Sequence, residues 1–342
     1  AEIMLQQTRV DTVRDYYHRW MERFPDVESV AEAEIEEILQ IWQGLGYYRR
    51  ARYLHRSARR VVDEHGGRLP DTAEGLEELV GIGPYTAGAI ASIAFDRAVP
   101  VVDGNVERVL SRLRTIDGDP KASENQKAYW RLAGQLVDPA RPGDFNQAMM
   151  ELGATLCTAQ NPGCLICPIR QHCRGFASGQ PETYPAPARR TPQKPMTVVT
   201  AVVARAGPVG RAGRVVKRPS EGLLAGLWEF PTVEVDGQEV TDGQQAAQPL
   251  EDYLEGTLSL SGGGVRETAA LDTITHLFSH IRMTIHARWY LLGPAASEPS
   301  APEGRPVAWV GESELDGVAM SAGMRRVQSA AARRTDVTGP GW

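Results

Sequence analysis

A proline-rich stretch divides the chain into two parts with different local patterning. Residues 178–195, with the sequence SGQPETYPAPARRTPQKP, hold five prolines in 18 residues. Proline at this density disfavours both a helix and a central strand, so we expect a semi-rigid linker. The sequence therefore predicts two domains, over residues 1–177 and 196–335, joined by residues 178–195.

The part before the linker has helical periodicity nearly throughout. Apolar residues recur at spacings of three and four, as in Ile35, Ile38, Leu39 and Trp42. Short segments such as HGGRLPDT and DGDPKAS, rich in glycine, proline and aspartate, separate the predicted helices. We therefore expect an all-α domain over residues 1–177.

The part after the linker has the pattern of strands. β-Branched or alternating segments are separated by turn residues, and they read MTVVTAVVARA, GRVVKRP, GLWEFPTVEV, RMTIHARWYLL and RPVAWV. Two short helices are expected at 245–254 and 312–330, and a frayed tail at DVTGPGW. This combination predicts an α+β domain.

Composition and charge limit the partners. Of the 342 residues, 42% are hydrophobic and 23% charged, and no apolar run approaches the length of about 18 residues that a membrane span requires. We therefore expect an intracellular protein that is not associated with a membrane. The formal net charge of −6 argues against nucleic-acid binding by the whole surface and leaves a local basic patch open.

One segment supplies such a patch. YYRRARYLHRSARR, which begins at Tyr47, contains six arginines and no acidic residue. On a helix, several of these arginines fall on one side. Two interpretations stay open: a solvated helix face, or a stripe that faces phosphates with Tyr47 and Tyr48 available to contact bases or sugars.

All four cysteines of the chain form one cluster. They follow the spacing C-x6-C-x2-C-x5-C and are Cys157, Cys164, Cys167 and Cys173. Four cysteines this close predict metal ligands rather than disulfides. The spacing alone leaves both a structural Zn²⁺ ion and a [4Fe-4S] cluster open.

Two further segments open predicted helices. In LVGIGPYTAGAIAS, Gly81 and Gly83 permit a tight turn, and the helix behind it offers free backbone N–H groups to a phosphate. In AVPVVDGNVERVLSRL, Asp103 stands between an apolar run and Gly104-Asn105. An aspartate in this position is typical of a helix N-cap, and it is also a candidate functional carboxylate.

Together these segments resemble a known family. EIMLQQT, GLGYYRRARYL, LVGIGPYTAGAI, VDGNVERVL, FNQAMMELGATLC and the cysteine spacing are similar, in this order, to the MutY-type adenine DNA glycosylases. These enzymes belong to the helix-hairpin-helix, Gly/Pro-Asp superfamily. The resemblance spans residues 2–175 and implies removal of adenine mispaired with 8-oxoguanine or guanine in double-stranded DNA. It also implies a [4Fe-4S] cluster on the four cysteines, and a monomeric protein of the bacterial cytoplasm that is associated with the nucleoid.

The second domain carries a resemblance of its own. RPSEGLLAGLWEFP resembles the opening of a Nudix-type domain, but the R-E-x-x-E-E helix of the hydrolytic enzymes does not follow. We expect a Nudix-like fold without hydrolase chemistry. The segment HLFSH is similar to a family loop near 8-oxoguanine, which implies lesion recognition by Phe278, Ser279 and His280.

The predicted chemistry needs an acid and a carboxylate. Loss of adenine requires protonation of the base and stabilisation of the sugar cation, which two carboxylates in different environments provide. Glu2, which adjoins apolar residues, is the predicted acid. Asp103 is expected to stay ionised and to face the oxocarbenium ion. Asn105 is expected to hold the sugar-phosphate or to position a water. The lyases of the superfamily have a lysine at the position of Tyr85, so Tyr85 predicts a glycosylase without strand cleavage and a side chain that supports Glu2.

The resemblance also assigns contacts to the DNA around the flipped adenine. Gln7, together with the adjacent Thr8, is expected to fill the gap that the flipped adenine leaves in the DNA duplex. Leu45 and Tyr47 are to lie on the other side of the opening. Glu151 is to lie near the adenine edge, and Gly81 and Gly83 are to grip a phosphate.

Two alternatives compete with this assignment: a bifunctional pyrimidine-lesion glycosylase and lyase, which Tyr85 disfavours, and a catalytically impaired protein that binds DNA damage.

Family members normally carry a tryptophan-containing segment before the glutamate. That N-terminal segment is expected to be missing here, which would leave Glu2 more solvated and the activity reduced.

Overall fold

The computed structural model describes residues 1–186, 192–207, 210–235, 247–258, 265–292 and 305–333. Its backbone contacts form two compact units, Ala1–Ala33 with Tyr53–Arg190 and Glu34–Arg52 with Thr191–Trp342. Residues 187–191 of the predicted linker, the start of the helix expected at 245–254 and the predicted tail lie outside the described residues. Within the described ranges, no helix combines the length and apolar character that a membrane crossing requires.

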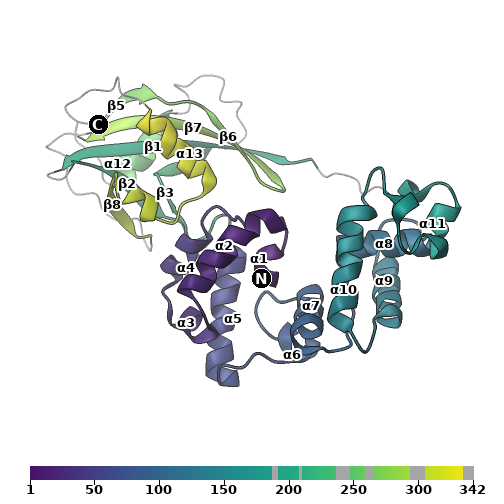
Figure 1. Ribbon diagram of the computed structural model, residues 1–342. Helices are drawn as coiled ribbons and strands as arrows, with labels where there is room; N and C mark the ends of the chain where they lie inside the picture. Colours follow the sequence, from purple (N-terminus) through teal and green to yellow (C-terminus); the bar gives the residue numbers. More distant parts are fainter. Residues whose placement is uncertain (187–191, 208–209, 236–246, 259–264, 293–304, 334–342) are drawn as a thin grey trace. The chain divides into compact units, whose positions relative to one another are not determined.

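The first unit is helical (Figure 1). Its α-helices are α1 (Glu2–Leu5), α2 (Val10–Arg23), α3 (Val27–Glu32), α6 (Ala73–Glu77), α7 (Pro84–Phe95), α8 (Gly104–Arg114), α9 (Ser123–Leu136), α10 (Pro142–Glu151) and α11 (Arg174–Ala177). Helix α5 (Arg49–His65) begins in the second unit and continues into the first. Short 3-10 or π turns complete the unit: η1 (Leu152–Leu156), η2 (Cys164–Ile166), η3 (Arg170–His172) and η4 (Pro181–Thr183).

Two apolar clusters hold these helices together. Leu110 of α8 packs with Tyr129 of α9 in one cluster, and Leu76 of α6 packs near Ala91 of α7 in the other. Small residues bring α7 unusually close to its neighbours: a Cβ atom on Gly88 would lie 2.4 Å from the Pro100 carbonyl oxygen. The segment that leads into α8 therefore runs directly against α7.

The second unit is built on a mixed sheet (Figure 1). Its elements are α4 (Ile35–Trp42), β1 (Lys194–Gly207), β2 (Gly210–Lys217), β3 (Trp228–Glu229), β4 (Thr232–Val235), α12 (Ala247–Gly256), β5 (Val265–Ala270), β6 (Ile274–Leu277), β7 (Ile281–Leu292), β8 (Val307–Gly311), η5 (Leu315–Gly317) and α13 (Ala322–Ala332). The sheet runs β3-β2-β1-β7-β5, with β4 on β1, β6 on β7 and β8 on β2. Strands β1 and β7 are parallel, and the other pairs are antiparallel.

Both faces of the central strand are buried. Val198 and Val202 of β1 face a cluster that includes Val327 of α13, whereas Val199 and Val203 face a cluster with Leu250 of α12. Successive side chains on a strand point to opposite faces, so a strand covered on both sides has a continuous apolar sequence. This explains the pattern MTVVTAVVA in the second part of the chain.

The predicted fold class, an all-α domain followed by an α+β domain, is confirmed. Two strands that the sequence patterns did not reveal, β5 and β6, join the sheet. The segment expected as one strand at GLWEFPTVEV is divided between β3 and β4, with Pro231 between them. The helix expected at 312–330 starts later, after the Ser321 side chain caps the backbone N–H of Met324.

Candidate active site and cysteine-lined cavity

A glycine turn places the beginning of α7. Gly81 has a φ angle of 82°, and a Cβ atom there would lie 2.4 Å from the Tyr53 ring, so only glycine fits. Gly83 is the N-cap of α7 and Pro84 occupies its first turn, with no side chain capping the helix. Backbone N–H groups at this helix N-terminus therefore remain available to an anion.

Tyr85 lies in the first turn of α7 and is half-buried. Burial, and then the charges of Glu2 and Asp103, raise the pKa of Tyr85 to about 12. Its hydroxyl donates to Sδ of Met150 on α10, at 3.6 Å. Tyr85 is thus a neutral phenol at neutral pH, and both carboxyl groups lie within electrostatic range of it. The predicted support of Glu2 by Tyr85 stays a prediction.

Asp103 caps helix α8. Its Oδ1 accepts hydrogen bonds from the backbone N–H groups of Asn105 and Val106, at 2.9 and 2.8 Å, and its Oδ2 accepts one from Nδ2 of Asn105 at 2.9 Å. These bonds satisfy donors that a helix N-terminus otherwise leaves free. The N-cap interpretation is therefore correct as structure. It holds the carboxylate in one orientation and is compatible with the predicted chemical role.

Glu2 lies on the short helix α1, whose Met4 is buried. Nε2 of Gln6 donates to Oγ1 of Thr86 on α7 at 2.8 Å, which ties this segment to the helix that carries Tyr85. Desolvation raises the pKa of the Glu2 carboxyl, and the neighbouring α-amino group opposes this shift. A carboxyl with a raised pKa keeps its proton to higher pH, as a general acid requires.

Three further predicted DNA contacts lie around these residues. Gln7 is exposed and has a left-handed backbone, with a φ of 56°. The Thr8 hydroxyl donates to the Gln6 carbonyl at 3.4 Å. Glu151 is exposed at the end of α10, next to Met150. Their roles stay predictions.

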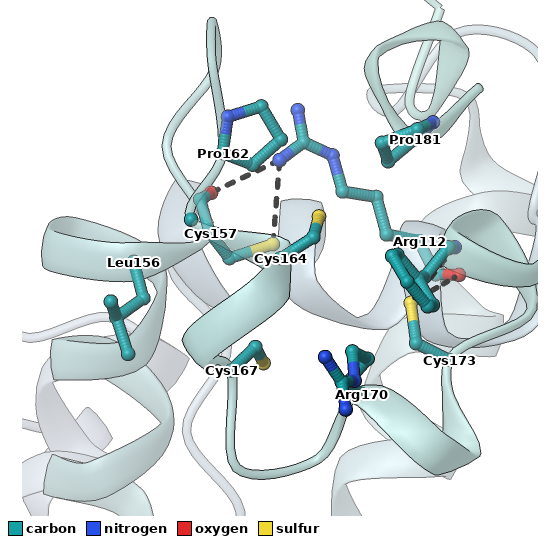
Figure 2. A pocket seen from close by; sticks show the side chains of 11 residues that line it. Arg112, Leu156, Cys157, Pro162, Cys164, Cys167, Arg170, Cys173 and Pro181 are labelled. Carbon is teal, nitrogen blue, oxygen red and sulfur yellow. Dashed lines mark hydrogen bonds between the residues drawn. The ribbon is translucent and has the colours of Figure 1, made fainter. Parts of the chain in front are cut away.

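The four cysteines surround one cavity (Figure 2). All four thiols are free, and Arg112, Arg170 and Phe176 are among the other residues that line the cavity. Among the described residues, no group of three or more His, Cys, Asp and Glu side chains is arranged to hold a metal ion. Burial is the main reason that the pKa of the Cys164 thiol is raised, with the other three sulfurs adding to the shift. The four predicted ligands thus line one cavity, and a bound cation would relieve the mutual repulsion of their thiolates.

Two arginines of α8 bind the cysteine-rich loop, and one of them, Arg108, also reaches the Asn105 side chain that donates to Asp103. The sequence motifs did not single them out. Arg112, only 2% exposed, donates to Sγ of Cys157 at 3.4 Å and to the Thr158 carbonyl at 2.7 Å. Arg108 donates from Nε to the Cys157 carbonyl at 2.7 Å and from Nη2 to Oδ1 of Asn105 at 2.9 Å. Their spacing of four on an amphipathic helix, one face of which is buried, was the available signal.

The predicted arginine stripe of α5 is largely used inside the protein. Arg50 donates to the Gly46 carbonyl, Arg52 to the Ala225 carbonyl, and Arg60 to Glu64 and to the Glu78 carbonyl. Arg49, Arg56 and Arg59 are exposed. Neither interpretation of the complete stripe is correct, because at least three of the six arginines bind protein groups.

In the second unit, Phe278, Ser279 and His280 form the turn between β6 and β7. The Phe278 ring packs edge-on against His276 with centroids 4.5 Å apart, while Ser279 and His280 are exposed and hydrogen-bonded to each other at 3.2 Å. Tyr47 is 46% exposed and Leu45 is 6% exposed. A buried Leu45 belongs to the core of the free protein, so its predicted contact with DNA would require a local change and stays a prediction.

Family models match both units. Residues 1–135 match the HhH-GPD superfamily of base excision DNA repair proteins, and residues 210–330 match the NUDIX domain. The fold and the site thus define a base-excision DNA repair protein of the helix-hairpin-helix class that carries a NUDIX domain.

Comparison with curated proteins narrows the class. The chain is 40% identical over 367 residues to the adenine DNA glycosylase of Mus musculus, with 96% of this chain and 70% of the mouse protein covered. It is 40% identical to that of Homo sapiens, with 96% and 66% covered. A solved thermostable thymine-DNA glycosylase is 30% identical over 52% of this chain and 82% of its own, with a TM-score of 0.48. The chain belongs to the adenine DNA glycosylase family, whose reaction is hydrolysis of an N-glycosidic bond in base excision repair.

Proposed function

We propose that this chain removes adenine paired with 8-oxoguanine or with guanine in double-stranded DNA and leaves the strand intact. One observation carries the proposal: three N–H donors fix the carboxylate of Asp103 at the N-terminus of α8, whereas Glu2 lies half-buried on the short helix α1. Two carboxyl groups in unlike surroundings are what cleavage of a glycosidic bond requires. Because adenine is inaccessible in the stack, it must be flipped out of the helix first.

Glu2 is the proposed proton donor. Desolvation by the surrounding protein raises the pKa of its carboxyl, so that a proton is held for the leaving adenine at N7. Once protonated, adenine departs as a neutral base, and the positive charge that develops is confined to the sugar.

Asp103 is the proposed stabiliser of that sugar cation. Three N–H groups donate to its carboxylate, which fixes the oxygens before the substrate arrives. A preorganised negative group needs no reorganisation as the oxocarbenium ion forms. Asn105, which accepts a hydrogen bond from Arg108, would orient the sugar-phosphate or the attacking water.

Cleavage of the strand would need an amine that attacks the sugar. The side chain at the position after the Gly81–Pro84 turn is Tyr85, and its pKa of about 12 keeps it a neutral phenol. A phenol forms no Schiff base, so we propose a glycosylase without lyase activity.

The exposed turn at Phe278, Ser279 and His280 is the proposed contact to 8-oxoguanine. Ser279 and His280 offer hydrogen-bonding groups, and Phe278 offers an aromatic edge. Phosphate contacts made by the N-terminus of α7 would add affinity that does not depend on sequence.

The donor set around the cysteine-lined cavity fits a [4Fe-4S] cluster held by Cys157, Cys164, Cys167 and Cys173. Binding of the cluster would stabilise the folded conformation of the cysteine-rich loop. Arg112 would donate a hydrogen bond to Cys157, one of the cluster's sulfur ligands. Iron and sulfide analysis of the purified protein, with Cys164→Ser as the comparison, tests this assignment. Stoichiometric zinc in place of iron would overturn it.

A duplex assay tests the activity. An A:8-oxoguanine duplex, labelled on the adenine strand, should show breaks only after alkali, whereas G:8-oxoguanine and T:8-oxoguanine duplexes should show none. Excision from a pyrimidine-lesion duplex, or binding without any excision, would contradict the proposal. Size-exclusion chromatography with light scattering tests the proposed monomer, and fractionation of the source cells tests the proposed place in the cytoplasm.

A further inference from the structure

The turn that presents Tyr47 has an unusual backbone. It joins α4 to α5, and Gly44 and Gly46 have φ angles of 95° and 77°. Tyr47 itself has a φ of 48°, a left-handed conformation that is unfavourable for a bulky residue. Such a conformation persists only where surrounding contacts impose it.

Part of the restraint is local. Nε1 of Trp42 donates to the Gly46 carbonyl at 3.0 Å. Nη2 of Arg50 donates to the same carbonyl at 3.2 Å, and the Arg50 guanidinium carbon lies 5.4 Å from the centre of the Tyr47 ring. Side chains of α4 and α5, the helices on either side of the turn, therefore both bind the carbonyl in its middle.

The remaining restraint comes from the C-terminal segment of the same compact unit. Oε1 of Gln43 accepts from Nη2 of Arg325 at 3.0 Å and from the backbone N–H of Met320 at 3.3 Å. The Tyr48 hydroxyl donates to the Met320 carbonyl at 3.3 Å and accepts from the backbone N–H of Gly44 at 3.2 Å. Both ends of the turn are thus held by Met320, which lies just before α13, and Gln43 is held in addition by Arg325 of α13.

Arg325 is itself held firmly. Its Nη1 donates to the Leu315 carbonyl and to Oε1 of Gln328, each at 2.7 Å. The guanidinium therefore has little freedom, and the position of Gln43 follows the position of α13.

The next residue of α13 faces the sheet. Nη1 of Arg326 donates to the Thr275 carbonyl of β6 at 2.9 Å. A Cβ atom on Gly323 would lie 3.1 Å from Ile285, which shows how closely α13 approaches β7. Strand β6 leads into Phe278, so one helix contacts both the Tyr47 turn and the strand that carries the proposed lesion contact.

We propose that α13 is a positioning element, which sets the Tyr47 turn through Gln43 and Tyr48 and couples it to the β6–β7 turn through Arg326. The proposal rests on the proposed function, since it assumes that Tyr47 and Phe278 act on the same mispair. Neither Arg325 nor Arg326 needs to touch DNA for this role.

Limited trypsin digestion of the free protein tests the positioning without any substrate. Mass spectrometry measures the rate of cleavage after the exposed Arg49. This rate should be severalfold higher in Gln43→Met and in the near-isosteric Tyr48→Phe than in the parent. Glu36→Gln is the matched control, because it loses the ion pair with Lys217 in the same unit and leaves the turn contacts intact. Equal cleavage rates in the parent and both turn variants would overturn the proposal.

A double-mutant cycle tests whether Gln43 acts through Tyr47. Gln43→Met should slow single-turnover excision from A:8-oxoguanine by about tenfold, the effect of losing one charge-assisted hydrogen bond. In a Tyr47→Ala background the same change should have no further effect. Fully additive effects of the two substitutions would overturn the proposal. The thermal midpoint of Tyr48→Phe should equal that of the parent, which would show that the effect on the turn does not come from unfolding.

Arg326→Met tests the coupling to the sheet. It should lower the preference for A:8-oxoguanine over A:G, and its effect should be non-additive with that of Gln43→Met; additivity would overturn the coupling. A parent chain that excises no adenine would refute the proposed function alone, because the trypsin comparison still decides the positioning.

Discussion

Arg108 donates a hydrogen bond of 2.9 Å to Oδ1 of Asn105, and the Asn105 amide group in turn donates to Asp103 at 2.9 Å. The same guanidinium donates to the Cys157 carbonyl at 2.7 Å. Asp103 and the cysteine-rich loop are therefore joined through one side chain, and a change at Arg108 should be felt at both.

Arg108→Gln should slow adenine excision by about 10- to 100-fold, because loss of the charged donor frees the amide that orients Asp103. Single-turnover kinetics on an A:8-oxoguanine duplex measures the effect. Arg114→Gln, an exposed change in the last turn of the same helix, is the control and should leave the rate unchanged. Equal rates for the two variants would contradict the role of Arg108.

Glu2→Gln should abolish excision while duplex binding is retained, because the amide keeps the shape of the side chain and has no acidic proton. Burial raises the pKa of Glu2, so in the parent the active protonated form is lost as the pH rises through that raised value. We therefore expect the single-turnover rate to fall toward alkaline pH. Glu124→Gln, in the first turn of α9, is the control. A rate that rose with pH would argue against Glu2 as the acid.

Gly81→Ala should destabilise the first unit strongly, since the new methyl group meets both a φ of 82° and the Tyr53 ring at 2.4 Å. The left-handed backbone alone costs about 1–2 kcal/mol. Urea unfolding should show this loss, whereas Gly83→Ala, where nothing lies within 4 Å, should change the free energy of unfolding far less. Equal midpoints for the two variants would show that the turn can rearrange.

Borohydride should fail to trap the parent chain on an A:8-oxoguanine duplex, because Tyr85 supplies no amine to the sugar. Denaturing gel electrophoresis of protein and DNA after reduction detects any covalent complex. Tyr85→Phe should be trapped as little as the parent. Efficient trapping of either protein, or strand breaks before alkali, would show that an amine elsewhere in the chain performs lyase chemistry.

Local sequence patterns were sufficient for the fold class and for the convergence of the cysteines. Periodicity distinguishes helices from strands, and the cysteine spacing brings four thiols to one cavity. The boundary between the two compact units could not be predicted from local sequence patterns. Residues 34–52 have a helical pattern like their neighbours, yet their contacts group them with the C-terminal unit.

The reason is that those contacts are tertiary. Gln43 and Arg325 lie far apart in the sequence, and neither has a local pattern that marks its partner. Arg108 and Arg112 were missed for a related reason: most of their acceptors are backbone carbonyls, whose positions depend on the tertiary fold and not on residue type. Short edge strands such as β6 depend on pairing with β7 rather than on their own composition.

The parallel pairing of β1 with β7 has a consequence for how the C-terminal unit forms. Lys194 to Ala204 are in register with Ile281 to Leu291, so the central pair of the sheet joins segments that leave the ribosome at well-separated times. Until β7 has been made, β1 has an open edge with unpaired backbone groups. A chain that ends before Ile281 would therefore expose a long apolar strand, and premature termination should yield aggregation rather than a smaller folded enzyme.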